Sequence, residues 1–290
     1  MRAAAILGLG CSPHTLGPFQ EIAGAEWTVG LPAETDPHDA VLVFGGDGTV
    51  HRHLSALVRL GLPVLVVPAG SGNDFARALR LFSAKDALAA WRKFVADGAN
   101  SRAVDLGTIT ADRADAKSVF YSCAAGVGLD GEIAQRANEL PRWLRRRGGY
   151  ALSLPAALAR FRPFEMRLTV RSDEKIEEAV SQDHRAVVAA VFANTPVYGG
   201  GMRIAPHAQM DDGLLDACLI RDISKLKLLG VFPSVYFGRH LGLREVEYFS
   251  VAAARVETDR PLDIYADGER ICQTPAEFSV APQALRVIVP

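Results

Sequence analysis

Short apolar runs alternate with helical patterns over the first hundred residues of the chain. Residues 41–44 and 64–67 are continuous apolar runs rich in β-branched side chains, a pattern that predicts buried strands. Each run is followed by a glycine-bearing loop and a helical pattern, over residues 49–60 and 74–81. The repeated order of strand and helix predicts βαβ units around a parallel sheet.

Both ends of this first region carry further local signals. Ser83 is placed to cap a helix that we expect to run to about residue 95 and to stop at Asp97-Gly98. Residues 2–11 faintly resemble a short secretory or lipoprotein signal that ends at a cysteine. Because their apolar stretch is brief, we expect a first β-strand there instead.

After Asn100 the pattern changes to strand-like segments separated by turns. These segments are residues 120–124, 164–171, 186–192, 214–220, 254–258, 262–265 and 285–289. Helices are expected only near residues 131–138 and 223–238. The predicted fold class is therefore α/β: a Rossmann-like domain with a parallel sheet over residues 1–100, followed by a β-sandwich domain over residues 101–290.

Composition narrows the class of protein. The chain has 290 residues, and 32 Lys+Arg against 33 Asp+Glu give a net charge of -1, which argues against a nucleic-acid partner. The longest later apolar run, residues 186–193, is too short to cross a bilayer. The cysteines are widely spaced, so we expect reduced thiols in the cytoplasm rather than a disulfide scaffold or a zinc site. They are Cys11, Cys123, Cys218 and Cys272.

One segment departs from the even charge balance. Eight arginines face only Glu139 and Glu165 between residues 136 and 167, and Trp143, Phe161 and Phe164 lie among them. The arginines are at positions 136, 142, 145, 146, 147, 160, 162 and 167. Basic and aromatic residues together suit an anionic membrane surface. A solvated helix face with core aromatics is an equal alternative.

The candidate chemistry begins with Gly45-Gly46-Asp47-Gly48-Thr49, which lies between a buried strand and a helix. Glycines there let backbone N–H groups approach a phosphate, and the helix adds its positive N-terminal end. Asp47 can orient a magnesium-bound or ribose group, and Thr49 offers a hydroxyl and a helix cap. An ordinary tight turn is the alternative for this segment taken alone.

A second loop of the same kind follows the next strand, in the sequence Pro68-Ala69-Gly70-Ser71-Gly72-Asn73-Asp74. Two glycine-rich turns at the carboxyl ends of neighbouring parallel strands line one crevice, and open α/β sheets bind ligands in such crevices. A single capping turn with Asp74 at the helix start is the alternative. The pairing of two such loops argues against it.

The two loops together carry a family resemblance. Gly-Gly-Asp-Gly-Thr, followed at this spacing by Pro-Ala-Gly-Ser-Gly-Asn-Asp-Phe-Ala-Arg, closely resembles the nucleotide half of the diacylglycerol kinase catalytic-domain family. That family includes bacterial lipid kinases and the sphingosine and ceramide kinases. The resemblance extends from about residue 41 to residue 290. It implies ATP and Mg²⁺ as cofactors, a nucleotide-binding first domain and a lipid-binding second domain.

Residues 194–206 and 211–216 support the same resemblance. In the family, the stretch around this Asp-Gly pair holds a structural magnesium through one carboxylate and nearby carbonyl groups. Carried over to this chain, the ligands are Asp212 and the backbone carbonyls of Gln209 and Leu214, which form an oxygen set that suits a hard cation. A plain Asp-Gly hairpin turn is the alternative.

Asp267-Gly268-Glu269 lies between strand-like segments near the C-terminus. If Asp267 and Glu269 lie on one strand, both carboxylates point to the same face and can meet one substrate hydroxyl. Taken alone, the segment is more typical of a hairpin turn. In lipid kinases of this type the Asp-Gly-Glu segment supplies the general base across the interdomain cleft. The resemblance carries this role to Asp267 and Glu269 without choosing between them.

Three features on the nucleotide side depart from the family pattern. The family places Asn-Pro-x-x-Gly after its first strand, and the nearest match here is Ser-Pro-His-Thr-Leu-Gly at residues 12–17. The segment before Gly45 is short, as if a helix were missing. Arg52 replaces the usual glutamate near the mouth of the first loop. A guanidinium attracts phosphate and repels metal, so we expect nucleotide binding that depends less on magnesium, and slow turnover.

The resemblance implies a cytoplasmic enzyme, peripheral to the membrane, that transfers the ATP γ-phosphoryl group to a lipid hydroxyl such as that of diacylglycerol in phospholipid biosynthesis. The sequence leaves the oligomeric state open, with a homodimer as one expectation. One alternative is an NAD kinase, which shares the Gly-Gly-Asp-Gly-Thr loop. Another is a non-catalytic lipid or nucleotide sensor of the same fold, which Arg52 and the altered first loop would favour.

Overall fold

The computed structural model describes residues 1–22, 24–141, 144, 149–171 and 186–290. The chain divides into two compact units, one of Met1–Asp105 with Pro282–Pro290 and the other of Leu106–Ala281. Two strands, β5 (Ser101–Ala111) and β15 (Ala276–Ile288), contribute residues to both units. The division expected after residue 100 differs from this one at the C-terminus, because the last residues return to the first unit and pair there with its sheet.

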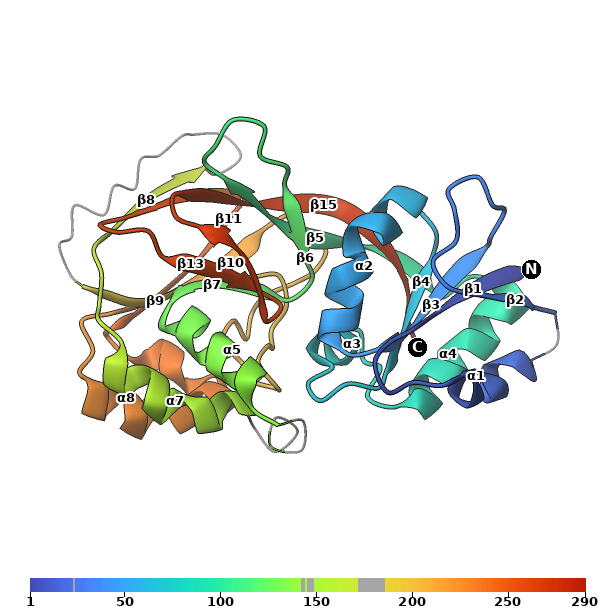
Figure 1. The fold of residues 1–290 in the computed structure, drawn as a ribbon, viewed down its shortest axis with the longest axis horizontal. Coiled ribbons are helices and arrows are strands. Elements are labelled where there is room, and N and C mark those ends of the chain that lie inside the picture. The colour runs from blue at the N-terminus through green and yellow to red at the C-terminus, as the bar shows by residue number, and fades with distance from the viewer. Residues whose placement is uncertain (23, 142–143, 145–148, 172–185) are drawn as a thin grey trace. The chain divides into compact units, whose positions relative to one another are not determined.

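The first unit is a parallel sheet with helices packed on it (Figure 1). Its strands follow the order β2-β1-β3-β4-β15, and each neighbouring pair is parallel. Their bounds are β1 Arg2–Leu7, β2 Glu26–Val29, β3 Ala40–Gly45 and β4 Val64–Pro68. Every residue of β3 is buried, as expected for a parallel strand covered on both faces. The predicted first strand and parallel sheet are confirmed.

The helices of the first unit follow the local signals, with two differences. They are α1 (Pro13–Gln20), α2 (Asp47–Leu60), α3 (Asp74–Ala78) and α4 (Ala84–Asp97). The hydroxyl of Ser83 caps α4 and Gly98 ends it in the left-handed conformation, as predicted. Helix α3 ends earlier than the expected residue 81 because Arg80 has a positive φ of 63°. The α1 helix was not predicted.

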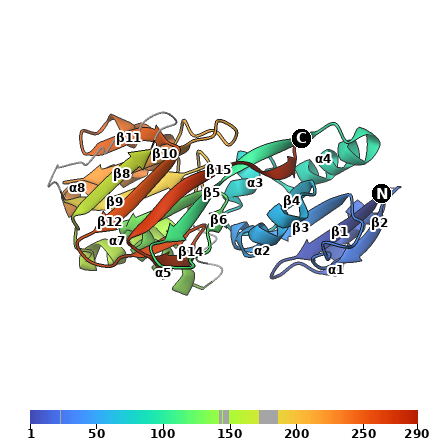
Figure 2. The ribbon, with the colours of Figure 1, turned by 90° about the horizontal axis from the view of Figure 1, so that it is seen from above.

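The second unit is a sandwich of two antiparallel layers (Figure 2). One layer has six strands in the order β11-β10-β9-β7-β13-β14, and the other contains β5, β6, β8, β12 and the first part of β15. The remaining bounds are β6 Val119–Tyr121, β7 Ala124–Gly128, β8 Met166–Arg171, β9 Val187–Ala193, β10 Leu215–Arg221, β11 Val246–Val251, β12 Ala253–Thr258, β13 Asp263–Ala266 and β14 Glu269–Gln273. The stacked rings of Phe192 and Phe278, 4.4 Å apart, join the layers, and the predicted sandwich is confirmed.

Helices α5 (Leu129–Glu139), α7 (Gly149–Arg160) and α8 (Lys225–Val231) accompany the second unit. The predicted helix near residues 131–138 corresponds to α5. The helix expected over residues 223–238 is wrong in its length, because α8 gives way to a 3-10 helix at Phe232–Phe237, where Pro233 lacks the N–H that an α-helix needs. Helix α7 was not predicted. None of the described helices is long and apolar enough to cross a membrane.

The structure decides between the two interpretations of the basic and aromatic segment, residues 136–167, for only part of its members. Phe161 and Phe164 are 7% and 2% exposed and belong to the core of the sandwich, so these two rings are core aromatics and do not reach a membrane. Trp143 lies outside the described residues, as do the arginines at positions 142, 145, 146 and 147. For the two phenylalanines, burial decides in favour of the structural alternative.

Candidate functional site

The two glycine-rich loops of the first unit begin side by side. Strands β3 and β4 are parallel neighbours, and Gly45 at the end of β3 is paired in register with Pro68 at the end of β4. The N–H of Ala69 donates to the carbonyl oxygen of Gly45 at 3.0 Å, which continues the pairing into the loops. The two loops therefore meet at the carboxyl edge of the sheet, as the sequence predicted.

The backbones of the two loops touch at Gly46 and Gly70. A Cβ atom added to Gly70 would lie 2.4 Å from the Cα of Gly46, and one added to Gly46 would lie 2.8 Å from the Cα of Gly70. No side chain fits at either position unless the backbone moves. Glycine is therefore needed here for the close approach of two main chains, which a tight turn alone would not require.

Side chains lock the contact between the loops. Asp47 Oδ1 accepts the N–H of Phe75 at 3.1 Å, and the carboxylate thereby bridges the first loop to helix α3. Asn73 has a positive φ of 56°, which lets its side chain fold back on Gly70. It accepts the Gly70 N–H at 2.7 Å and donates to the Gly70 carbonyl at 3.0 Å. Asp47 and Asn73 thus fix the shape of the loops.

The other predicted nucleotide residues occupy the same two loops. Gly46 is the N-cap of α2, and Asp47, Gly48 and Thr49 form its first turn, in which the Thr49 N–H donates to the Gly46 carbonyl at 2.9 Å. The Thr49 side chain packs on Gly45 and Gly8, since a Cβ on either glycine would lie 2.5 Å from its Oγ1.

The remaining members of this set differ in exposure. Ser71 is exposed and Gly72 is half-buried, while Asp74 is buried at the start of α3. Arg52 is exposed on α2, one turn after Gly48. The guanidinium also contributes to lowering the pKa of His53, for which burial is the larger cause. The structure thus brings the two loops together and leaves Arg52 on the solvent side of the helix.

In the second unit, Asp267 and Gly268 form the tight turn between β13 and β14. Both residues have positive φ, 50° and 87°, as in a two-residue hairpin turn. Asp267 Oδ2 accepts the Ser122 N–H at 2.7 Å and the Ser122 hydroxyl at 3.0 Å. Its Oδ1 accepts the Cys123 N–H at 2.8 Å. The carboxylate is therefore held in one orientation by the segment that leads into β7.

Of the two interpretations of this segment, the hairpin turn is confirmed, and a single strand that contains both Asp267 and Glu269 is wrong. Asp267 is a turn residue, whereas Glu269 is the first residue of β14 and is paired with Ala266. Glu269 is exposed, and Asp267 is half-buried and anchored. The rule that residues two apart on a strand point to one face does not apply across a turn, so the two carboxylates have different surroundings.

Residues 122–124 also hold Asn194, the first residue of the 194–206 stretch that supports the family resemblance. Asn194 is fully buried; its N–H donates to the Cys123 carbonyl at 2.7 Å and its Nδ2 donates to the Ser122 carbonyl at 3.0 Å. Asp267 donates its own N–H to the Ala124 carbonyl at 3.0 Å. Two motifs far apart in sequence are thus joined through one short segment that the sequence did not single out.

A buried acid beside β7 was also not predicted from the sequence. Asp130, at the start of α5, is hydrogen-bonded to the hydroxyls of Tyr150 and Tyr198, which lie 3.1 Å from each other. A Cβ on Gly126 would lie 2.0 Å from Asp130 Oδ2, so glycine makes room for the carboxylate. The pattern Gly126-Val-Gly-Leu-Asp130, with a glycine four residues before an acid, is the available sequence signal.

Burial shifts the pKa values of this cluster. It raises the pKa of the Asp130 carboxyl to about 6, although the hydrogen bond from Tyr198 opposes the shift. It also raises the pKa of Tyr198 well above the ordinary value, and the charge of Asp130 adds to this. Asp130 therefore changes charge close to neutral pH.

The predicted metal ligands lie in the loop that leads into β10. Asp212 is exposed, its Oδ1 accepts the Leu214 N–H at 3.0 Å, and Gly213 between them has a φ of 74°. The charge of Asp212 is among the causes that raise the pKa of the buried Asp216, after burial itself. Two nearby carboxylates and the carbonyls of this loop are oxygen donors, which fit a hard cation. In the described part of the chain, no group of three or more His, Cys, Asp or Glu side chains is placed to hold a metal.

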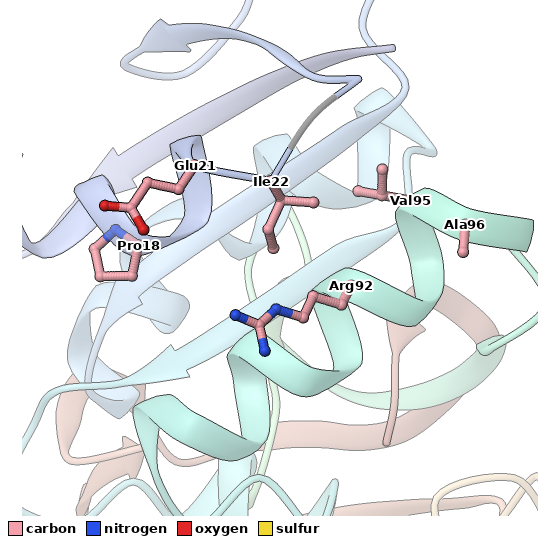
Figure 3. Close-up of a pocket in the computed structure, with 6 residues that line it drawn as sticks. All are labelled: Pro18, Glu21, Ile22, Arg92, Val95 and Ala96. Carbon is pink, nitrogen blue, oxygen red and sulfur yellow. The ribbon is translucent and has the colours of Figure 1, made fainter.

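A hollow of about 570 Å³ opens elsewhere on the first unit (Figure 3). It lies between α1 and α4 and is lined by Pro18, Glu21, Ile22, Arg92, Val95 and Ala96. None of the predicted site residues lines it. Glu21 and Arg92, of opposite charge, are the charged residues that line it.

Comparison with known proteins gives one family match in each half of the chain. Residues 24–109 match the diacylglycerol kinase catalytic domain, and residues 123–289 match the YegS C-terminal NAD kinase beta sandwich-like domain. A diacylglycerol kinase of Mycobacterium tuberculosis is 37% identical over 252 residues, which cover 87% of this chain and 77% of the relative. A diacylglycerol kinase of Bacillus subtilis is 25% identical over 257 residues, with 87% and 78% covered.

Solved structures agree in fold. A diacylglycerol kinase from Bacillus anthracis superposes with a TM-score of 0.68 at 16% identity, over 100% of this chain and 97% of that one. An NAD kinase from Archaeoglobus fulgidus in complex with ATP gives a TM-score of 0.55 at 14% identity, over 99% and 93%. At these identities the two structures show the fold alone. The family matches go further: the chain belongs to the diacylglycerol kinase family and is a kinase.

The contact between the loops yields a first prediction. Gly70→Ala should weaken ATP binding about tenfold or more and lower Tm, because relieving such an overlap costs about 1–3 kcal/mol and displaces one loop. Gly242→Ala is the matched control, since its added Cβ meets nothing within 4 Å. Titration calorimetry and thermal melting measure the two effects. Equal ATP affinity in Gly70→Ala and the wild type would show that the loops do not bind the nucleotide.

The buried acid yields a second prediction. Because the pKa of Asp130 is raised on folding, the folded state binds the extra proton between about pH 4 and 6, and this group's contribution to stability falls as pH rises through that range. Asp130→Asn removes the dependence. The Tm of the variant relative to the wild type should therefore increase by several degrees between pH 4.5 and pH 7, which corresponds to about 2 kcal/mol in stability. A difference that does not change with pH contradicts the burial of an ionisable Asp130.

Proposed function

We propose that this protein is an ATP-dependent lipid kinase that transfers the γ-phosphoryl group of ATP to a lipid hydroxyl such as that of diacylglycerol. The observation that carries the proposal is the backbone contact of Gly46 with Gly70, which joins two glycine-rich loops at the carboxyl ends of adjacent parallel strands. Membership of the diacylglycerol kinase family and the names of its relatives support the lipid substrate.

In this proposal the loops of the first unit bind the phosphates of ATP. Backbone N–H groups in the first turn of α2, with its positive end, attract the phosphate oxygens. Arg52 adds a positive charge on the same helix. A magnesium ion bound with ATP would spread the charge of the transferring group, and the carboxylate of Asp47 is an oxygen donor that fits it. Asp47 already fixes the two loops to each other.

Asp267 is the proposed proton acceptor, and its anchored carboxylate supports the choice over the exposed Glu269. A group held in one orientation does not have to be ordered again at each turnover. The lipid O–H bond breaks as its proton passes to the carboxylate, a bond forms between that oxygen and the γ-phosphorus, and the bond from the γ-phosphorus to the β-phosphate oxygen breaks. ADP and the phosphorylated lipid are the products.

The direct test is incubation with γ-labelled ATP, magnesium and either dispersed diacylglycerol or NAD⁺, followed by separation of the products. Label in the chloroform-soluble fraction is the expected result. Label on NAD⁺ would favour the NAD kinase alternative. Binding of ATP and lipid with no transfer to any acceptor would favour a non-catalytic sensor. Either of the last two results rejects the proposal.

Asp267→Asn should lower turnover by about 10²–10⁴-fold, the usual contribution of a general base. It should also lower Tm, because the variant presents an amide where the carboxylate now accepts three hydrogen bonds. Glu269→Gln should leave both nearly unchanged. Ser122→Ala is the matched control, since it removes one of the donors and keeps the carboxylate. Loss of turnover only in Glu269→Gln would transfer the role to Glu269, and unchanged turnover in both would reject the assignment.

We further propose that Asp212, with the carbonyls of Gln209 and Leu214, holds a structural magnesium ion in the second unit. The ion would offset the repulsion between the carboxylates of Asp212 and Asp216. The pKa of Asp216 is raised mainly by burial, and the charge of Asp212 adds to the shift. Magnesium should therefore raise the Tm of the wild type and leave that of Asp212→Ala unchanged in thermal melting. Asp211→Ala is the matched control. Equal responses of wild type and Asp212→Ala to magnesium would contradict the site.

A further inference from the structure

Helix α7 is apolar on both of its sides. Leu154, Ala157 and Leu158 are buried in the core of the sandwich, as an amphipathic helix requires. The opposite side carries Leu152, Pro155, Ala156 and Ala159, which are all exposed and spaced three and four residues apart. They form one continuous stripe along the helix. A helix that is apolar all round normally has something covering both sides.

Helix α8 lies beside α7 and carries exposed leucines of its own. The Nζ of Lys225 at its start donates to the carbonyl of Ala159 near the end of α7 at 3.0 Å (Figure 1). Leu228 is buried and anchors α8, whereas Leu226 and Leu229 are 84% and 39% exposed. The exposed apolar residues of these two neighbouring helices are called here the α7–α8 face. Its members are Leu152, Pro155, Ala156, Ala159, Leu226 and Leu229.

Exposed cations lie on and beside the two helices, although Asp222 before α8 is also exposed. Helices α7 and α8 contain no acidic residue, and Arg160, Arg162 and Lys225 lie exposed where the two helices meet. Lys227 is also on α8, but its Nζ is paired with Glu245 at 2.5 Å, which reduces its contribution. Exposed leucines bordered by cations match the two parts of an anionic lipid surface, since the acyl region accepts the leucines and the headgroups attract the cations.

We propose that the α7–α8 face docks the second unit on an anionic lipid bilayer. The proposal deepens the proposed function and rests on it for the lipid nature of the substrate: the face would hold the protein on the surface that contains the substrate. A second copy of the chain is the less suitable occupant. A two-fold contact would bring together two faces that both carry Arg160, Arg162 and Lys225 and have no acid on their helices.

The test is co-sedimentation with vesicles in the absence of nucleotide. The wild type should bind vesicles of phosphatidylcholine mixed with phosphatidylglycerol, bind phosphatidylcholine alone more weakly, and lose the difference in high salt. Leu226→Asp and Leu152→Asp should each weaken binding about tenfold or more without lowering Tm. Phe82→Asp is the matched control: Phe82 is 69% exposed in the first unit, and its replacement should leave vesicle binding unchanged.

Three results would overturn the proposal. One is vesicle binding that neither leucine variant weakens. Another is equal weakening of vesicle binding by Phe82→Asp, which would mean that any exposed apolar side chain contributes to the binding. The third is a wild-type dimer that Leu226→Asp converts to a monomer in light scattering, with vesicle binding unchanged, which would assign the face to a second copy. Because no turnover is measured, the outcome is separate from that of the labelled-ATP test: vesicle docking by an inactive protein would reject the kinase activity and keep the face.

Discussion

The glycine-rich edge of the first unit depends on one backbone contact, the approach of Gly46 to Gly70. The parallel pairing of β3 with β4 brings the two loops to the same edge, and the absence of side chains lets their main chains meet. Asp47 and Asn73 then fix the arrangement through hydrogen bonds to Phe75 and Gly70. The residues that define the family motif are thus first of all the residues that make the contact possible.

The second unit positions its carboxylates in a different way. Two of its carboxylates are positioned next to strand β7, with Asp267 anchored just before the start of the strand and Asp130 folded back over Gly126 from just beyond its end. The two carboxylates have different surroundings. Asp267 accepts hydrogen bonds from main-chain N–H groups and a serine hydroxyl, whereas Asp130 is buried and bonded to tyrosine hydroxyls. One strand thereby presents an anchored carboxylate and an acid whose charge responds to pH near neutrality.

Sequence reasoning was strongest where local rules decide the structure. Continuous apolar runs identified β3 and β4, and Ser83 and Gly98 marked the ends of α4, because these signals act within a few residues. Reasoning failed where distant contacts decide. Helix α7 was missed because both its sides are apolar and show no period, and the cluster of Asp130, Tyr150 and Tyr198 was missed because it joins residues up to 68 positions apart. The turn at Asp267 was considered, but its partners Ser122 and Cys123 lie outside any local pattern.

The most direct test of the contact between the loops as a nucleotide site is a crystal structure with magnesium and a non-hydrolysable ATP analogue. We expect the triphosphate to lie against the backbone N–H groups that follow Gly46 and Gly70, with Asp47 still bonded to Phe75. A triphosphate bound elsewhere on the first unit, such as in the hollow beside Arg92, would contradict the role assigned to the two loops.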